Sequence, residues 1–132
     1  MKAISSNVTR GINVGARLKC IDNTGAKEVE VIAVRSYKGI RRRIPKAGVG
    51  DVVIVSVKKG DVKIRNEVFP AVIVRQRMPY KRPNGITVKF EDNAVVLMTE
   101  KLEPKGKEVK EVVAREAVER FPTIGKIARI IV

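Results

Sequence analysis

Apolar and polar residues alternate over several short stretches of this chain, and a period of two predicts β-strands. Residues 16–21 carry small or apolar side chains at every second position, on either side of Arg17 and Lys19, and residues 28–35 alternate in the same way. Residues 52–57 form a nearly continuous β-branched run, which is typical of a buried strand. Further strands are expected over residues 62–65, 69–75, 86–90 and 94–98. Six or seven short strands at this spacing favour a small, mainly β barrel over a sandwich.

The stretch from residue 71 to residue 97 is expected to form a basic finger. Two apolar segments, 71–74 and 94–97, flank a loop that turns at Asn84-Gly85. The loop carries four cations, Arg75, Arg77, Lys81 and Arg82. Because no acidic residue lies between Glu67 and Glu91, these cations have no local partner, and we expect them to face water or an external anion.

After Thr99 the apolar residues fall at helical spacings. Within residues 107–121 one apolar stripe predicts an amphipathic helix that Pro122 ends. The stripe consists of Val109, Val112, Val113, Ala117 and Phe121. Residues 123–132 fit either a second short helix or an extended segment. We therefore expect a single domain over 1–132, with an N-terminal arm at 1–15, a barrel with basic loops at 16–98 and a helical region at 107–132.

Charge points to the class of partner. Lys and Arg total 28 against 14 Asp and Glu, giving a net charge of +14. Self-repulsion of that size disfavours a compact chain unless a polyanion offsets it, so nucleic acid is the first candidate and an acidic membrane surface the second. The densest basic run, residues 35–46, lies in a stretch without acids from Val31 to Gly50.

Arginine dominates both basic loops, and its planar guanidinium binds phosphate through two hydrogen bonds. We therefore expect RNA binding through Arg35, Lys38, Arg41, Arg42, Arg43, Lys46, Arg75, Arg77, Lys81 and Arg82. A solvated face that only maintains solubility is the alternative, although such faces usually mix both signs of charge. Only Tyr37 and Tyr80 lie in the basic loops, which favours recognition of folded RNA by shape over stacking of unpaired bases. The three phenylalanines are expected in the core.

Catalysis is disfavoured because the chain has no histidine to serve as a base near neutral pH. Cys20 lies in an alternating segment and is expected to be a buried core residue. The glycines at 48 and 50 match no nucleotide-binding loop and are expected to form a turn. We expect no metal, cofactor or small-molecule substrate, and the absence of a leader or membrane span predicts a soluble cytoplasmic protein.

Residues 71–97 also resemble the signature of the L14 family of large-subunit ribosomal proteins. The shared features are the small-aliphatic run at 71–74, the basic spacer, Asn84-Gly85, and then Phe90, Asn93, Val96 and Leu97. Residues 22–27, Gly50-Asp51, Lys58-Lys59 and Arg115-Glu116 extend the resemblance along the chain. Residues 8–12 and 20–24 are more similar to the archaeal and eukaryotic branch than to the bacterial one.

The resemblance implies a five-stranded barrel with a projecting ribbon and C-terminal helices, bound to large-subunit ribosomal RNA. It also implies a position facing the small subunit, with a bridge to small-subunit ribosomal RNA. The C-terminal region would contact neighbouring large-subunit proteins and factors that block subunit joining, through Val112, Arg115, Glu116 and Glu119. Many relatives open the helix with Gly-Pro, but this chain has residues 111–114 as Glu-Val-Val-Ala, so we expect an earlier helix start.

Two rival functions remain open at this point. The protein could be a free architectural or chaperone-like nucleic-acid binder that acts off the ribosome. It could also be an enzyme acting on RNA, which would need a carboxylate with a shifted pKa in a pocket. Constant stoichiometry with large subunits would separate the ribosomal role from both rivals.

Overall fold

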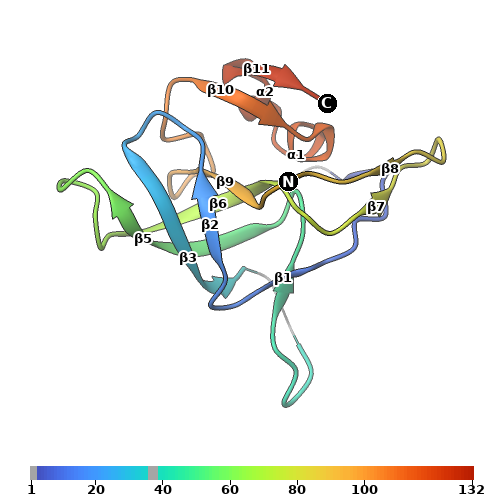
Figure 1. Ribbon diagram of the computed structural model, residues 1–132, viewed down its shortest axis with the longest axis horizontal. Helices are drawn as coiled ribbons and strands as arrows, with labels where there is room; N and C mark the ends of the chain where they lie inside the picture. The colour runs from blue at the N-terminus through green and yellow to red at the C-terminus, as the bar shows by residue number, and fades with distance from the viewer. Residues whose placement is uncertain (1–2, 36–38) are drawn as a thin grey trace.

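A closed five-stranded barrel forms the centre of the computed structural model, which describes residues 3–35 and 39–132 (Figure 1). Its strands are β2 (Arg17–Cys20), β3 (Ala26–Val34), β5 (Val52–Gly60), β6 (Val68–Arg75) and β9 (Ala94–Leu97), in that order around the barrel. Neighbouring strands are antiparallel except β2 and β9, whose parallel pairing of Lys19 with Ala94 and Cys20 with Val95 closes the barrel. The predicted barrel is confirmed.

The barrel core is built from β-branched side chains, as the alternation predicted. Val29, Val55, Ile73 and Val95 are fully buried. Residues 71–75 of β6 and all of β9 are buried, because the outer face of this part of the barrel is also covered. The backbone N–H of Ala114 donates to the Val74 carbonyl at 3.0 Å and ties the covering layer to β6.

The covering layer is the C-terminal part of the chain, at the top of Figure 1. It contains β10 (Val109–Val113), α1 (Arg115–Arg120), α2 (Pro122–Ile127) and β11 (Ala128–Ile131). Strands β10 and β11 pair in parallel, with Val112 opposite Ile130 and Val113 opposite Ile131. Two short C-terminal helices are therefore confirmed, and the final residues are helical first and extended afterwards.

The helix predicted over 107–121, with its early start, is wrong in its first half. Residues 109–113 are a strand, and helix α1 begins only at Arg115. The buried residues Val109 and Val113 lie four positions apart, a spacing that fits the period of a helix as well as that of a strand. A register shift between Val109 and Val112 also breaks the strict alternation of a strand. The pairing with β11 decides for the strand, which β-branched valines suit. Pro122 does not simply end a helix but is the first residue of α2.

Two other strand predictions also need correction. Residues 62–65 form a turn, in which the Asp61 carbonyl accepts hydrogen bonds from the N–H groups of Ile64 and Arg65, because β5 continues to Gly60. The strand expected over 86–90 is reduced to β8 (Thr87–Val88). The turn at Gly48–Gly50 and the burial of Cys20 are confirmed. Phe121 is buried as predicted, whereas Phe69 and Phe90 are only partly buried against the core.

Two segments of the chain project from the barrel (Figure 1). The segment between β3 and β4 (Lys46–Ala47) extends downward in the figure, and β4 pairs with β1 (Ile12–Asn13) at its base. The second projection is the ribbon of β7 (Tyr80–Lys81) and β8, which extends to the right. The two predicted basic loops therefore project from different sides of the barrel.

Candidate nucleic-acid interface

The β3–β4 segment presents three consecutive arginines, Arg41, Arg42 and Arg43, all exposed. The N–H of Arg43 donates to the Ile40 carbonyl at 2.9 Å, so residues 40–43 form a turn. Arg42 has a φ of 68°, a backbone conformation that normally favours glycine. Within the described ranges these arginines form no ion pair with the protein, so their charge is available to an external anion.

The base of this segment is fixed to the barrel. The Arg35 N–H donates to the Val52 carbonyl at 3.0 Å, and the Gly11 N–H donates to the Ala47 carbonyl at 3.2 Å. Arg35 and Lys46 are exposed at the two ends of the segment. Lys38 and Tyr37, predicted in this loop, lie outside the described residues. The arrangement places a cluster of cations on an anchored projection.

The β7–β8 ribbon carries fewer free cations than expected. Lys81 and Arg77 are exposed, and no ion pair involves either within the described parts of the chain. The ribbon turn is closed by a 2.9 Å hydrogen bond from the Arg82 N–H to the Ile86 carbonyl, and Gly85 has the positive φ of 85° that this turn requires. The predicted turn at Asn84-Gly85 is confirmed.

The expectation that every cation of the finger faces water is wrong for Arg75 and Arg82. Arg75 is buried, its Nη2 lying 2.7 Å from Glu111 and its Nε 3.1 Å from Asp92. The Arg82 side chain is only 11% exposed and pairs with Glu116. Asp92 lies just after the stretch without acids, but Glu111 and Glu116 come from beyond the finger in sequence, so a local count of acids could not reveal those two partners. Neither guanidinium is free to bind phosphate in this arrangement.

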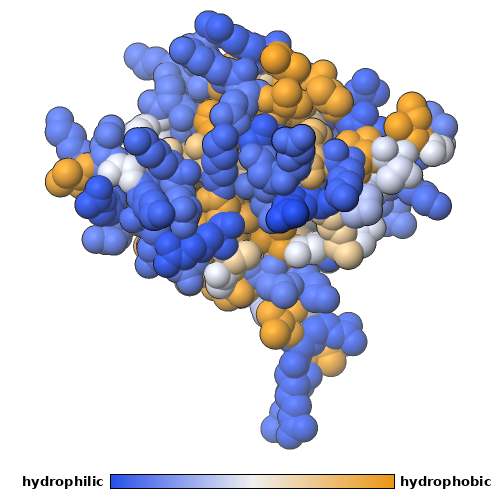
Figure 2. Space-filling view, in the orientation of Figure 1, coloured by the Kyte–Doolittle hydropathy of each residue, from blue (hydrophilic) through white to orange (hydrophobic). Residues whose placement is uncertain are grey.

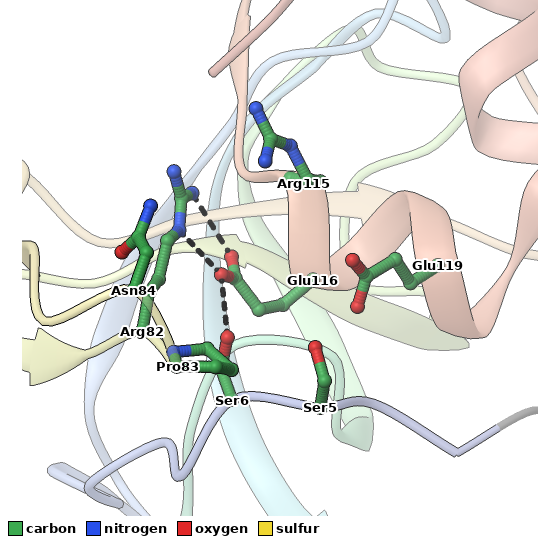
Figure 3. Close-up of a pocket in the computed structure, with 8 residues that line it drawn as sticks. All are labelled: Ser5, Ser6, Arg82, Pro83, Asn84, Arg115, Glu116 and Glu119. Carbon is green, nitrogen blue, oxygen red and sulfur yellow. Dashed lines mark hydrogen bonds and ion pairs between the residues drawn. The ribbon is translucent and has the colours of Figure 1, made fainter.

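Glu116 connects three segments of the protein (Figure 3). Its carboxylate accepts hydrogen bonds from Tyr80 Oη at 2.7 Å, Arg82 Nε at 2.7 Å and Ser6 Oγ at 3.0 Å. The three donors belong to the ribbon and the N-terminal arm, while Glu116 lies on α1. This network fixes the ribbon against the C-terminal layer.

The network determines how its members titrate. Burial alone would raise the pKa of Glu116, but hydrogen bonds from Arg82 and Tyr80 hold that pKa below its ordinary value. Burial and the neighbouring Glu116 carboxylate raise the pKa of Tyr80. The pKa of Glu111 is also lowered, because Lys19 and Arg75 outweigh its desolvation. Both carboxylates are therefore charged near neutral pH.

The residues predicted to contact proteins differ in how far the structure exposes them. Arg115 is exposed, while Val112 and Glu119 are half-buried. Glu116 is 1% exposed and points inward to Arg82, so its prediction as an interface residue is wrong. The apolar side chains of Ile130, Ile131 and Val132 are exposed beside this region, and Figure 2 shows apolar surface there.

Lys89, which was not among the predicted contacts, is an exposed cation near the ribbon that forms no ion pair within the described residues. A single lysine after a short strand gives no local signal of binding. Burial raises the pKa of the Cys20 thiol, which disfavours the reactive thiolate. In the described part of the chain, no three His, Cys, Asp or Glu side chains are grouped to hold a metal. No helix there is long and apolar enough to cross a membrane.

Comparison with known proteins agrees with the family resemblance of the sequence. The sequence profile of the family described as "Ribosomal protein L14p/L23e" matches residues 11–132. The large ribosomal subunit protein uL14 of Methanococcus vannielii is 53% identical over 131 residues, which cover 99% of each chain. The uL14 protein of Methanococcus maripaludis is equally similar over the same span, in agreement with an archaeal-type sequence. The chain therefore belongs to the L14p/L23e family of ribosomal proteins, cytoplasmic structural components of the large ribosomal subunit and not enzymes.

Proposed function

We propose that this protein binds large-subunit ribosomal RNA through its two projections. The contacts proposed are those predicted from the sequence, without the two buried guanidiniums. They are Arg35, Lys38, Arg41, Arg42, Arg43, Lys46, Arg77 and Lys81. Lys38 stays in this set on the sequence alone, because it lies outside the described residues.

The observation that carries the proposal is the exposed triplet Arg41–Arg43 on an anchored projection. Two exposed cations of β2 are instead paired, Arg17 with Glu28 at 3.1 Å and Lys19 with Glu111 at 3.0 Å. The triplet has no such partner in the described residues. Phosphates would offset its self-repulsion and release counterions. Because the barrel fixes both ends of the segment, the entropy cost of ordering on binding is confined to its tip.

We further propose that the protein faces the small subunit and contributes to a bridge with small-subunit ribosomal RNA. The support is the family resemblance together with the two projections, which extend from different sides of the barrel. One projection could contact RNA of its own subunit while the other reaches outward. The contacts with large-subunit and with small-subunit ribosomal RNA would both weaken as the salt concentration rises.

The C-terminal layer is the side proposed to contact neighbouring large-subunit proteins and factors that block subunit joining. Arg115, Glu119 and Val112 lie there, next to the exposed apolar residues of β11. This surface mixes apolar and charged groups, as protein interfaces do, whereas the β3–β4 segment is dominated by cations. Glu116 is not part of the proposed contact, since it is buried.

The test replaces Arg41, Arg42 and Arg43 together with glutamate and measures incorporation into large subunits by sucrose-gradient fractionation. The matched control replaces three exposed lysines outside both proposed contact surfaces, Lys27, Lys63 and Lys101, with glutamate, which gives the same change in net charge. We expect the arginine variant to stay at the top of the gradient with its fold intact, and the control to be incorporated. Normal incorporation of the arginine variant would refute the proposed contacts. Wild-type protein that leaves the subunits with light RNA after mild salt would instead support a free nucleic-acid binder.

A further inference from the structure

A small hollow lies beside the base of the ribbon, between the segment that follows β6 and the segment that follows β8. It is lined by Arg77, Lys89, Phe90 and Glu91. An adjoining hollow shares Lys89, Phe90 and Glu91 as its wall. Phe90 therefore borders open space on the protein surface, although part of its side chain packs against the core.

The two segments that form the hollow are held together by hydrogen bonds. The Phe90 N–H donates to the Gln76 carbonyl at 3.2 Å, and the Arg77 N–H donates to Asn93 Oδ1 at 2.8 Å. The fully buried Gln76 side chain accepts from the Val49 N–H at 2.9 Å and donates to the Thr9 carbonyl at 2.8 Å. The lining residues therefore sit on backbone that is already ordered before any ligand binds, which lowers the cost of binding.

Among the residues that the structure describes, the charged side chains that line the hollow form no ion pairs, unlike charged side chains close to it. Arg75 and Asp92 pair with each other nearby, whereas no ion pair involves Arg77, Lys89 or Glu91 within the described ranges. All three of these unpaired side chains belong to exposed residues. Two free cations beside an aromatic side chain combine phosphate binding with a surface on which a base can stack. A free carboxylate adds an acceptor for N–H or O–H donors.

We infer that this hollow binds one unpaired ribonucleotide of an RNA strand. The base stacks on Phe90, the phosphate contacts Arg77 and Lys89, and Glu91 accepts a hydrogen bond from the 2′-hydroxyl. The carboxylate cannot sit beside the phosphate without repulsion, so it selects the sugar side of the nucleotide. The inference rests on the proposed RNA binding and adds a base contact that phosphate recognition by the arginine triplet does not need.

The experiment follows the backbone amide signals of residues 77 and 89–91 by NMR while a short single-stranded RNA is added to the full chain. The same-sequence DNA serves as the comparison for the 2′-hydroxyl, and adenosine monophosphate as the comparison for a free nucleotide. We expect saturable shifts with RNA and weaker binding of DNA and of the free nucleotide. Phe90→Leu should weaken RNA binding about tenfold, since stacking accounts for that order of affinity.

Phe69→Leu is the matched control, because Phe69 is also a partly buried aromatic residue, with Lys105 Nζ 4.3 Å from the centroid of its ring. It should leave RNA binding at the hollow unchanged. Lys89→Gln, a surface change that cannot disturb the core, should weaken RNA and DNA alike, and Glu91→Gln should reduce the preference for RNA. Equal RNA affinity of the wild type, Phe90→Leu and Lys89→Gln would overturn the inference.

The two proposals can fail separately. Repeating the titration with the Arg41, Arg42 and Arg43 glutamate variant should preserve the shifts at residues 89–91, since the hollow does not include the β3–β4 segment. If folded ribosomal RNA binds through the triplet but the hollow shows no saturable shifts, only the further inference fails. If the wild type binds neither RNA, the proposed function fails as well.

Discussion

Arg82 and Glu116 form an ion pair that joins the β7–β8 ribbon to helix α1, with Arg82 Nε 2.7 Å from Glu116 Oε1. The two residues are 34 positions apart in sequence, and their side chains are 11% and 2% exposed. Arg82 Nη2 also donates to the carbonyl of Val132, the residue after β11, at 2.7 Å, so the ribbon is tied to the end of the C-terminal layer as well. This pair links the side proposed to bind RNA with the side proposed to bind protein.

Glu116→Gln should lower the free energy of unfolding by about 3 kcal/mol, because it leaves the Arg82 guanidinium buried without a counterion. Urea unfolding measures the loss. Glu108→Gln is the control, since Glu108 pairs with Arg129 at the surface and such pairs contribute at most about 1 kcal/mol. Equal losses in the two variants would show that the Arg82–Glu116 pair carries no special stability.

Stability should fall in acid through the lowered pKa values of Glu116 and Glu111. A carboxylate whose pKa is lower in the folded than in the unfolded protein stabilises the fold fully when the pH is above its ordinary pKa of 4.5. This contribution is lost as the pH falls through the lower pKa that the group has in the folded protein. Urea midpoints measured from about pH 7 to about pH 3 should therefore hold steady at first and then drop. In Glu116→Gln the drop should be shallower. A drop of the same size in both proteins would contradict the assignment to Glu116.

Arg42→Gly should weaken RNA binding without destabilising the protein, because glycine adopts the φ of 68° without strain. Arg42→Ala removes the same charge but keeps a side chain in the strained conformation. If Arg42 contacts one phosphate, both variants should reduce the slope of log affinity against log salt by about 0.9. Filter binding to large-subunit ribosomal RNA at several salt concentrations measures the slope. An unchanged slope in both variants would exclude Arg42 as a phosphate contact.

Gly60→Ala should destabilise the barrel by about 2 kcal/mol or more, because a methyl group there would lie 2.6 Å from the Gly25 carbonyl oxygen and 2.9 Å from Ala26 Cα. Both are backbone atoms next to the β3–β5 pairing and cannot move aside easily. Gly85→Ala is the comparison, because Gly60 and Gly85 both have a positive φ, but nothing lies within 4 Å of a methyl group added at Gly85. We expect it to cost about 1 kcal/mol. Thermal melts of the two variants should differ accordingly, and coincident melts would refute the packing argument.

Local patterns in the sequence were sufficient for the barrel. The alternation around Leu18, the valine run of β5 and the apolar segments at 71–74 and 94–97 each predicted a strand that the structure contains. Burial of Cys20 and the turn at Asn84-Gly85 followed in the same way. These features depend on residues that are neighbours in sequence, where the two-residue period and the conformational preferences of glycine and asparagine act directly.

Other features depended on contacts between distant parts of the chain. Residues 109–113 became a strand because β11 supplied a partner, although their spacing also fitted a helix. Arg75 and Arg82 were neutralised by Glu111 and Glu116, which lie 36 and 34 residues away. The sequence alone determined where cations are concentrated and which segments form the barrel. Only the tertiary structure decided which of those cations remain free, because an ion pair depends on distance in space and not on separation along the chain.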